Sequence, residues 1–331
     1  MANIKEVAKL AGVSISTVSR AISGSAKLSP ATMEKVQAAI EELHYAPDYI
    51  AQALKKGSTH TISLIVPTIL NPYFPKLLDS FNAEINRAGY ATFLNISNYS
   101  KENELLSLES SKAFSVDGIV YVPSTDDTEH IKKMVECGIP IVVVNRSPDV
   151  RAVCVTNNDR LGGFKATEHL INNGHRRICF FVGNTDLQHM RGRYEGCCEA
   201  MEKYGIPRDA AVFCHEDSLK SIFEKSNDVL SSDSRVTAFF ASSDWMTKAI
   251  YSAIKSHKMS IPGDISVVGF DDIDDSQYMF PPLTTWQHPV TQIVQEAVSQ
   301  LIKQIENVEE PEHRLYVKSG CMMIRESVRA I

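Results

Sequence analysis

The stretch Asn3 to Ser23, NIKEVAKLAGVSISTVSRAIS, decides the fold of the amino-terminal part of the chain. Counted from Ile4, a small residue (Ala8) stands at position five, a glycine (Gly12) at nine and a branched apolar residue (Val18) at fifteen. A small residue lets two helices approach, a glycine forms the tight turn between them, and a branched residue packs the second helix onto the first. This spacing predicts a helix-turn-helix.

The polar residues of this stretch predict where its helices begin and which face the second one exposes. Asn3 followed by Glu6 is typical of a capping box, and Ser14 is expected to cap the second helix. The outer face then carries Ile15, Ser16, Thr17, Ser19 and Arg20. Hydroxyls and an arginine at the start of an exposed helix suit phosphates and base edges in a DNA major groove. The alternative is an ordinary helical hairpin with a polar face.

Two more helices are predicted before the body of the chain. Ser29-Pro30 begins the first, in which Met33, Val36, Ile40 and Leu43 recur at helical spacing. Asp48 can cap the second, Tyr49 to Lys56, whose 8 residues are too few for a stable isolated helix in water. We expect it to form only against a partner helix and DNA, with Leu54 as a wedge between base pairs in the minor groove. The alternative is a plain linker.

Length and charge divide the chain. Its 331 residues suggest two or three structural units, and an apolar fraction of 44% is ample for their cores. The net charge is −6, yet residues 1–60 hold seven Lys/Arg against five Asp/Glu, which leaves −8 for the remainder. A surplus of two positive charges binds phosphate weakly, so we expect two such units to act together.

Several classes of function lack support in the sequence. The seven cysteines show no CxxC and no zinc-type spacing with histidine, which indicates free thiols in a reducing cytoplasm. No signal peptide opens the chain, and no apolar run reaches the ~18–20 residues of a membrane span. There is no P-loop, GxSxG or HExxH motif. We therefore expect a cytoplasmic protein that is not an enzyme, has no membrane role, and needs no cofactor or metal.

From Thr61 onward, strands and helices alternate. The predicted strands are 62–67, 90–96, 118–122, 139–144, 177–182, 211–215, 238–241 and 266–270. The predicted helices are 73–88, 102–114, 131–137, 158–173, 193–204, 219–230 and 247–257. Uniformly apolar strands predict parallel sheets covered on both faces, here as two similar α/β units. Ligands of such sheets bind beyond the carboxyl ends of the strands, which predicts a cleft between the two units.

The chain resembles, from end to end, the lactose-repressor (LacI/GalR) family of bacterial transcription regulators. The matching stretches are IKEVAKLAGVSISTVSRAISG, IAQAL, IVPTILNPYF, DGIV, RYEG, SSD, IPGDISVVGFDD and PPLTT. The resemblance implies a homodimer on a palindromic operator and a body of doubly wound parallel sheets like a periplasmic sugar-binding protein. Only five residues follow Ile324-Arg325-Glu326, so we expect a dimer rather than a tetramer.

The resemblance also implies domain boundaries and DNA contacts. It gives a DNA-binding domain at 1–46, a hinge at 47–60 and an effector-binding and dimerisation domain at 61–331. The last would comprise an N-subdomain (about 61–158 and 290–318) and a C-subdomain (about 159–289 and 319–331). The implied DNA contacts are Ser14, Ile15, Ser16, Thr17, Ser19, Arg20, Tyr49, Ala53, Leu54 and Lys55. Arg20 can pair with a guanine, Ile15 can touch a thymine methyl, and Leu54 is the intercalating hinge leucine.

For a small-molecule effector, the resemblance implies the contacts Tyr73, Phe74, Asn145, Arg146, Arg193, Asp244 and Asp271. The tyrosine and phenylalanine could stack on a ring, or simply be core aromatics. Arg193 could bind hydroxyls or a carboxylate, or form a structural salt bridge. Asp271 stands where the ligand usually donates hydrogen bonds, whereas Asp244 could equally cap a helix. Asp159 is a weaker candidate.

The expected function is a repressor of a carbohydrate-utilisation operon, with a sugar or sugar derivative as effector. The alternatives within the family are a purine or nucleoside effector and a protein corepressor. The corepressor has little support, since the helix from Gln292 to Gln304 offers it only Lys303. Another alternative is a ligand-binding module with no DNA role, but residues 1–57 would then have no function. An aspartate cluster, Asp271, Asp272, Asp274 and Asp275, lacks the glycine of a calcium loop and is expected to form a turn.

Overall fold

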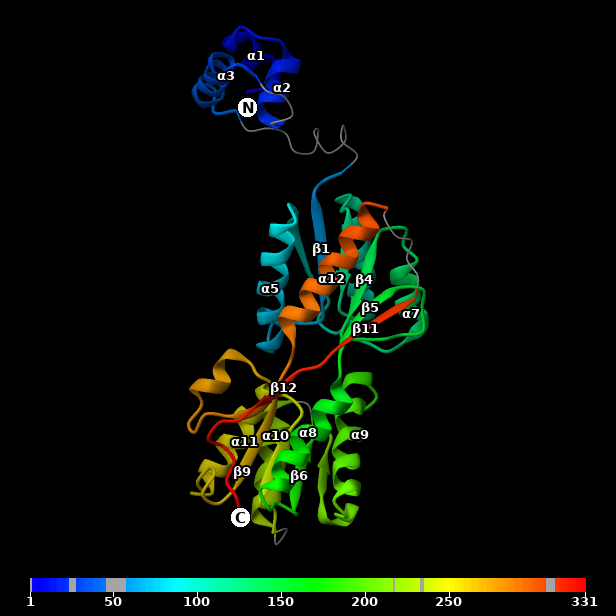
Figure 1. The fold of residues 1–331 in the computed structure, drawn as a ribbon, viewed down its shortest axis with the longest axis vertical. Coiled ribbons are helices and arrows are strands. Elements are labelled where there is room, and N and C mark those ends of the chain that lie inside the picture. The colour runs from blue at the N-terminus through cyan, green and yellow to red at the C-terminus, as the bar shows by residue number, and fades with distance from the viewer. Residues whose placement is uncertain (1, 24–27, 46–57, 217, 233–234, 308–312) are drawn as a thin grey trace. The chain divides into compact units, whose positions relative to one another are not determined.

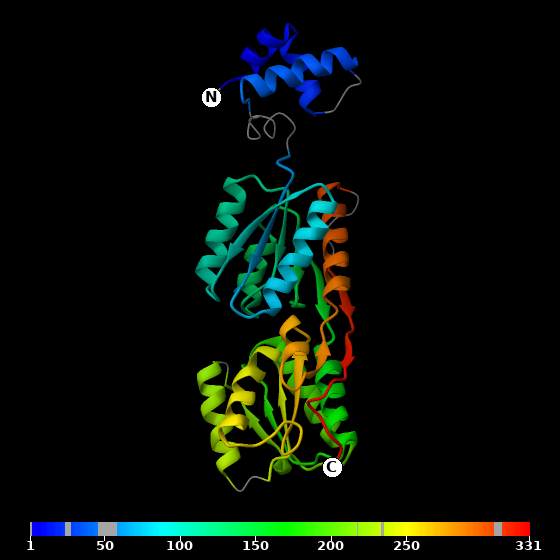
Figure 2. The same ribbon diagram turned by 90° about the vertical axis from the view of Figure 1, so that its left-hand side faces the viewer.

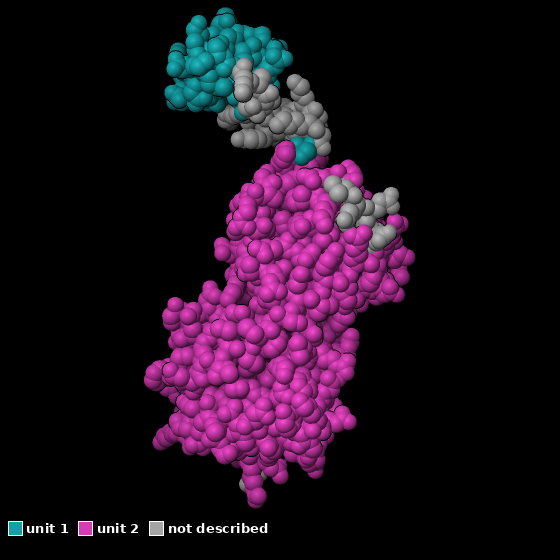
Figure 3. All heavy atoms as spheres, in the orientation of Figure 1, with its two compact units in different colours: residues 1–59 teal, residues 60–331 magenta. Residues whose placement is uncertain are grey.

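A computed structural model describes residues 2–23, 28–45, 58–216, 218–232, 235–307 and 313–331. The chain divides into two compact units, Met1–Thr59 and His60–Ile331, which Figure 3 shows in two colours. The predicted hinge helix from Tyr49 to Lys56 lies outside the described residues, and so do the predicted DNA contacts Tyr49, Ala53, Leu54 and Lys55.

The first unit is a three-helix bundle of α1 (Ile4–Ala11), α2 (Ile15–Ser23) and α3 (Pro30–Glu42) (Figure 1). Its core consists of Val7, Ala8, Ala11, Val18, Val36 and Ala39, all of them buried. The sequence predicted all three helices, and Ala8 and Val18 lie in the core as their spacing required.

The ends of α1 are formed as predicted. The Asn3 side chain accepts hydrogen bonds from the Lys5 and Glu6 backbone amides, while Glu6 accepts one from the Asn3 amide at 2.9 Å. Gly12 ends the helix in the left-handed conformation, at φ 65°, and its amide donates to the carbonyl of Ala8. Side chains rarely adopt this φ, so glycine is the residue suited to the turn. The helix-turn-helix is confirmed.

The second unit contains two six-stranded sheets. The first, called sheet A here, has the order β11-β5-β4-β3-β1-β2, and sheet B has the order β12-β10-β9-β8-β6-β7. Sheet A comprises β1 (Thr61–Val66), β2 (Ala91–Ile96), β3 (Gly118–Tyr121), β4 (Ile141–Val144), β5 (Val153–Asn157) and β11 (Arg314–Lys318). Sheet B comprises β6 (Ile178–Phe181), β7 (Val212–Cys214), β8 (Ala238–Ala241), β9 (Ser266–Asp271), β10 (Thr284–Gln287) and β12 (Cys321–Met323). Every pairing is parallel except that of β10 with β12.

Helices cover both faces of each sheet (Figure 2). Against sheet A, α5 (Tyr73–Arg87) and α12 (Val290–Ile305) pack on one face, and α6 (Lys101–Ala113) and α7 (Thr128–Val135) on the other. Against sheet B, α8 (Asp159–Asn172) and α9 (Gln188–Lys203) face α10 (Leu219–Ser231) and α11 (Asp244–Ser256) across the strands. Two short 3₁₀ helices, Arg208–Ala210 and Asp274–Tyr278, complete the described elements. Among the described helices, none is both long and apolar enough to cross a bilayer.

The chain passes between the two halves of this unit three times, from β5 to α8, from β10 to α12 and from β11 to β12. Figure 1 shows the last passage, in which one continuous segment adds an edge strand to each sheet. The predicted α/β fold is confirmed, but the sequence prediction missed β5, β10, β11 and β12. These strands are short, and what stabilises them is pairing with distant strands: β11, for example, pairs with β5 about 160 residues earlier.

Helix α9 also begins earlier than predicted, at Gln188 rather than Arg193. Gly192 lies within this helix, although glycine disfavours helix interiors. In the structure this glycine faces α8, where an added Cβ atom would lie only 3.3 Å from the Cβ atom of Asp159. Gly192 therefore lies at a moderately crowded part of the interface between the two helices.

Candidate functional sites

Helix α2 presents the predicted DNA-reading residues on one side. Ser14, Ile15, Ser16 and Arg20 are exposed, Thr17 and Ser19 are half-buried, and the intervening Val18 is fully buried. Ser14 caps the helix as predicted, since its Oγ accepts a hydrogen bond from the Thr17 amide at 3.1 Å.

This face carries hydroxyl groups, one apolar side chain and one arginine. The hydroxyl of Ser14 lies 2.7 Å from that of Ser16 and 2.8 Å from that of Thr17, so three hydroxyls gather at the start of the helix. Ile15 is 46% exposed, so its methyl groups are accessible to a partner such as a thymine methyl. The contacts of this face with DNA remain a prediction.

A cavity of about 530 Å³ lies in the second unit. Its lining comes from both halves, and many of its residues directly follow strands, as expected for parallel sheets. The lining residues most relevant to binding are Thr68, Asn71, Tyr73, Phe74, Ser124, Asn145, Arg146, Asp159, His189, Met190, Arg193, Trp245, Asp271 and His288. Six of the seven predicted effector contacts are therefore brought together, as is Asp159. Asp244 is not among the lining residues.

Arg193 lies at the centre of the polar contacts in this cavity and is only 4% exposed. Its Nε donates to Asp159 Oδ1 at 2.8 Å, and its Nη1 donates to the Ser242 carbonyl and lies 3.4 Å from Asp271 Oδ1. The guanidinium also stacks on Phe270, 3.8 Å from the ring centre. Burial alone would lower the pKa of Arg193, but the two carboxylates outweigh it and raise the pKa. This side chain is therefore a charged, rigidly held hydrogen-bond donor.

Asp271 ends strand β9 in an unusual backbone conformation, with φ 117°. Its Oδ2 accepts a hydrogen bond from Ser243 Oγ at 2.8 Å. Burial raises the pKa of Asp271 from 3.8 to about 6, and Arg193 limits that rise. The strained backbone and the buried carboxyl together are typical of a functional position.

Asp244, also a predicted effector contact, has a different environment. Its carboxyl group is fully buried, which raises its pKa to about 8, and it accepts hydrogen bonds from the Ile273 amide and from the hydroxyls of Ser276 and Thr285 at 2.6 to 3.1 Å. The cap of α11 is Ser243, whose Oγ accepts from the Trp245 amide at 3.3 Å. These contacts give Asp244 a structural role, holding the turn after β9 against β10.

In the half that contains sheet A, Tyr73 and Asn145 form a pair, with the Asn145 amide nitrogen 2.9 Å from the Tyr73 hydroxyl. Burial raises the pKa of Tyr73, so its hydroxyl keeps its proton. Phe74 packs edge-on against Tyr73, with ring centres 5.3 Å apart. Beside them, Arg146 forms an ion pair with Asp126 at 2.9 Å, while burial lowers the pKa of Arg146.

Two histidines that line the cavity, His189 and His288, were not predicted from the sequence. His288 Nε2 lies 2.9 Å from Arg193 Nη2 and must accept that hydrogen bond, so its proton is on Nδ1, which has no partner among the described residues. His189 Nδ1 is likewise unpaired there. Burial lowers the pKa of both rings, and both are neutral. His288 directly follows β10, so predicting that strand from PPLTTWQ would have pointed to it.

Direct side-chain and backbone contacts also join the two halves. Gln188 of α9 donates from Nε2 to Ser147 Oγ at 2.7 Å, and its backbone amide donates to Asp126. Lys76 of α5 donates to the Asp272 carbonyl at 2.7 Å and pairs with Asp274 at 2.9 Å. These polar contacts are among those that hold the halves around the cavity.

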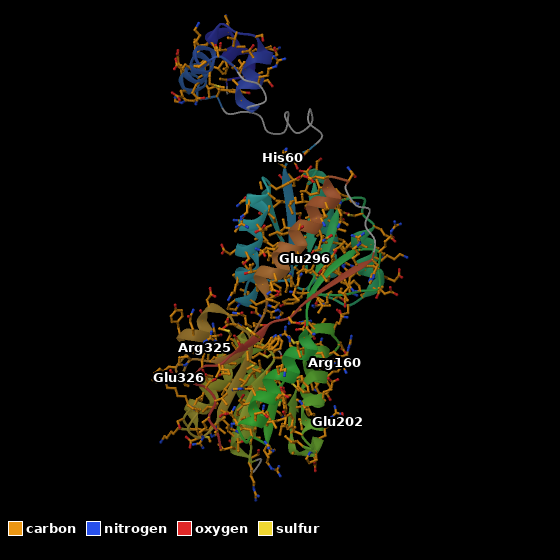
Figure 4. The ribbon with its side chains drawn as sticks, in the orientation of Figure 1. His60, Arg160, Glu202, Glu296, Arg325 and Glu326 are labelled. Carbon is orange, nitrogen blue, oxygen red and sulfur yellow. The ribbon has the colours of Figure 1, made fainter. Side chains whose placement is uncertain are left out.

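The aspartate cluster is dispersed among several partners. Asp272 pairs with Arg325 at 2.6 Å (Figure 4 labels Arg325) and accepts from Gln287 at 2.8 Å. Asp275 pairs with Lys248 at 2.9 Å on the surface. Each of these carboxylates thus has its own cationic or amide partner.

Comparisons with known proteins match both units. A family model described as "Bacterial regulatory proteins, lacI family" matches residues 3–48, and one described as "Periplasmic binding protein-like domain" matches residues 167–328. The HTH-type transcriptional repressor PurR of Vibrio parahaemolyticus is 34% identical over 343 residues, covering all of both chains. The ribose operon repressor of Escherichia coli K12 is 33% identical over 310 residues, covering 92% of this chain and 93% of the relative.

Solved structures agree with these matches. The regulator CelR in complex with cellobiose is 28% identical with a TM-score of 0.73, and covers 99% of this chain and 100% of that one. A LacI-family regulator of Enterococcus faecium with bound ribose is 26% identical with a TM-score of 0.74, and covers 82% of this chain and 99% of that one. The lac repressor dimer bound to operator and an anti-inducer has a TM-score of 0.88 at 23% identity, covering 99% of both chains, and thus shares the fold.

Proposed function

Since this chain belongs to the lacI family of bacterial regulatory proteins and is a DNA-binding transcriptional repressor, we propose that its affinity for its operator is set by a small polar ligand in the cavity of residues 60–331. The single observation that carries this proposal is the cavity itself. It joins a held arginine and a buried carboxyl to aromatic rings, and its lining comes from both halves of the unit. The proposal requires no cofactor, metal or catalytic step, and the protein would act in the cytoplasm, where its operator is.

The DNA contacts would come from Ser14, Ile15, Ser16, Thr17, Ser19 and Arg20, together with the hinge residues Tyr49, Ala53, Leu54 and Lys55. Because residues 1–60 carry a surplus of only two positive charges, one copy would neutralise few phosphates. We therefore propose a homodimer on a palindromic operator, with the first domain at 1–46, the hinge at 47–60 and the subdomains divided near residues 158, 289 and 318.

We propose a carbohydrate as the ligand and a carbohydrate-utilisation operon as the target. Arg193, Asp159 and Asp271 form the alternating donor and acceptor groups that suit adjacent hydroxyls. Support comes from the relatives as well, because the CelR structure holds cellobiose and the Enterococcus faecium regulator holds ribose. A purine or nucleoside is the second candidate, since the aromatic residues Tyr73 and Phe74 line the cavity and aromatic rings stack on bases. A protein corepressor remains the third.

The mechanism would be a coupling between the cavity and the DNA. A ligand that contacts both halves changes their preferred angle, and the contacts of Gln188 and Lys76 between the halves would form or break with it. The paired hinge segments would then be held at a spacing that allows or prevents insertion of Leu54 into the minor groove. To switch operator occupancy fully, the ligand must prefer one arrangement by about 5 kcal/mol.

The proposal can be tested with the full-length protein. An operator is first selected from a random DNA pool, and its binding is then titrated over a range of salt with D-ribose, cellobiose, hypoxanthine and adenosine. We expect one class of compound to change the affinity. Asp271→Ala should bind the operator normally but lose this response, because it removes the buried acceptor.

Asp275→Ala is the matched control, since it removes a carboxylate of the same type from a surface ion pair outside the cavity lining. A normal response from Asp271→Ala would show that the effector binds elsewhere. Selection of no DNA sequence would contradict the DNA-binding part of the proposal.

A further inference from the structure

We propose that this cavity selects an uncharged ligand and rejects phosphorylated and carboxylated forms of the same compound. The inference rests on the proposed function, because it concerns the effector cavity, and it specifies what the carbohydrate or nucleoside must lack. Its basis is the charge balance of the described lining residues together with Asp126, which pairs with the lining residue Arg146.

The first cation of the lining, Arg193, is already neutralised. Two carboxylates lie against its guanidinium, Asp159 at 2.8 Å and Asp271 at 3.4 Å, and the Ser242 carbonyl and His288 occupy further N–H groups. A ligand phosphate placed here would compete with two buried carboxylates for one positive charge. It would also lie close to both of them in a poorly solvated site, where like charges repel strongly.

The second cation, Arg146, is also matched by a carboxylate. Asp126 lies 2.9 Å from its Nε, and Arg146 Nη1 donates to the Asn145 carbonyl at 2.8 Å. No lysine is found among the described lining residues. Counted together, Arg146 and Arg193 face the three carboxylates of Asp126, Asp159 and Asp271, so this part of the cavity has no positive charge to spare.

The groups without partners point to the same conclusion. Ser124 Oγ, His189 Nδ1 and His288 Nδ1 are buried lining atoms that find no hydrogen-bond partner among the described residues, and so is Arg146 Nε, although it lies 2.9 Å from Asp126 Oδ1. The first three belong to neutral side chains, because burial keeps both imidazoles uncharged, and the charge of Arg146 is matched by Asp126. A buried polar atom left unpaired costs free energy, so a ligand hydroxyl, ring oxygen or carbonyl that satisfies these atoms would bind favourably without carrying charge.

The test uses matched pairs of compounds that differ only by a charged group: D-ribose and D-ribose 5-phosphate, cellobiose and cellobionic acid, and inosine and inosine 5′-monophosphate. Binding to the full-length protein is measured by isothermal titration calorimetry. We expect the neutral member of at least one pair to bind. Its charged partner should bind about tenfold or more weakly, because its phosphate or carboxylate would lose its hydrogen bonds to water without finding new ones in the cavity.

Two variants test the cause. Asp126→Asn keeps the shape of the side chain but releases Arg146 from its carboxylate, and Asp159→Asn does the same for Arg193. Each should raise the affinity for the charged member relative to its neutral partner by about tenfold. Glu199→Gln is the control: it removes one carboxylate from an exposed pair with Arg160 (Figure 4), so it changes the net charge equally but should leave the ratio unchanged.

Each outcome decides the matter. A charged compound that binds the wild-type protein as tightly as its neutral partner overturns the inference and leaves the proposed effector site intact. If the ratio of charged to neutral affinity shifts equally in Glu199→Gln and Asp126→Asn, the carboxylate beside Arg146 is not the cause of the selectivity. If no compound of any pair binds, the proposed effector site fails together with the inference.

Discussion

At the scale of single residues, Asp271 combines burial, charge and an unusual backbone. Its carboxyl is 4% exposed, and its φ of 117° is one that residues other than glycine rarely adopt. This backbone conformation and the buried carboxyl lower the stability of the fold. The contacts of the carboxyl with Ser243 and Arg193 hold Asp271 in this conformation. The charge of this carboxyl should therefore influence both ligand binding and stability.

The stability effect has a definite sign. Because burial raises the pKa of Asp271 from 3.8 to about 6, the folded protein holds this proton more tightly than the unfolded chain does. Its contribution to the free energy of unfolding therefore falls as the pH rises from about 4 to about 6 and stays low above that, by about 3 kcal/mol in all. We expect Asp271→Asn to lack this dependence.

Urea unfolding followed by tryptophan fluorescence can measure it, because both tryptophans, Trp245 and Trp286, lie in the second unit. Between pH 5 and pH 7, the wild-type protein should lose about 1 kcal/mol relative to Asp271→Asn. A difference between the two proteins that does not vary with pH would show that the carboxyl titrates at its ordinary value.

Arg20 is the residue at which DNA sequence discrimination can be tested. We expect Arg20→Lys to lower the preference for the selected operator over a variant base pair by about 1–3 kcal/mol, because lysine lacks the planar fork that pairs with guanine. Fluorescence anisotropy with both DNA sequences measures this preference.

Lys9→Ala is the matched control for Arg20, since it removes an exposed positive charge from α1 rather than from the reading helix. It should weaken binding to both sequences equally. Equal loss on both sequences by Arg20→Lys would assign Arg20 to the phosphate backbone instead.

At the scale of elements, the packing of α8 on α9 positions Arg193. Gly163 lies so close to α9 that an added Cβ atom would be 2.1 Å from the Arg193 carbonyl oxygen, whereas at Gly192 the nearest atom would be 3.3 Å away. We expect Gly163→Ala to force the helices apart and to lower the free energy of unfolding by about 3 kcal/mol or more.

Gly192→Ala offers a comparison on the same interface. There the mild crowding is offset by the better helix propensity of alanine, so the change should be about 1 kcal/mol or less. Urea unfolding at one pH compares the two variants. Equal stability of both would mean that the helices adjust freely and that Arg193 is positioned by its hydrogen bonds alone.

The same elements show what the sequence could predict. Helices with strong local patterns, such as α1 with its Asn3 cap and Gly12 turn, were predicted closely because the interactions that define them lie within a few residues. Strands β5, β10, β11 and β12 were missed because pairing with distant segments stabilises them. For the same reason His288, which follows β10, was absent from the predicted site, while Asp244 was included although its carboxylate is used by Ser276 and Thr285.

At the scale of the whole molecule, the second unit is built so that its halves depend on each other. Three passages of the chain and the contacts of Gln188 and Lys76 join them, and the lining of the cavity needs both. A ligand bound there acts on the arrangement of the halves. The first unit, in contrast, has its own core and its own caps, and can be tested on its own.

The final prediction follows from the small charge of that first unit. Residues 1–59 carry seven Lys/Arg and five Asp/Glu, so a single copy gains little from releasing counterions. If two copies held by one dimer are required, an isolated fragment of residues 1–59 should bind the operator about 100-fold or more weakly than the full chain, because linkage makes the second binding event intramolecular. Its affinity should also fall about half as steeply with salt, since about half as many phosphates are neutralised.

Fluorescence anisotropy over a range of salt measures both the affinity and its salt dependence, and circular dichroism verifies that the fragment is helical. The full chain on DNA with one half-site is the control and should behave like the fragment. A fragment that bound as tightly and selectively as the full chain would show that one DNA-binding domain suffices. Dimerisation could then not couple the effector cavity to operator binding as proposed.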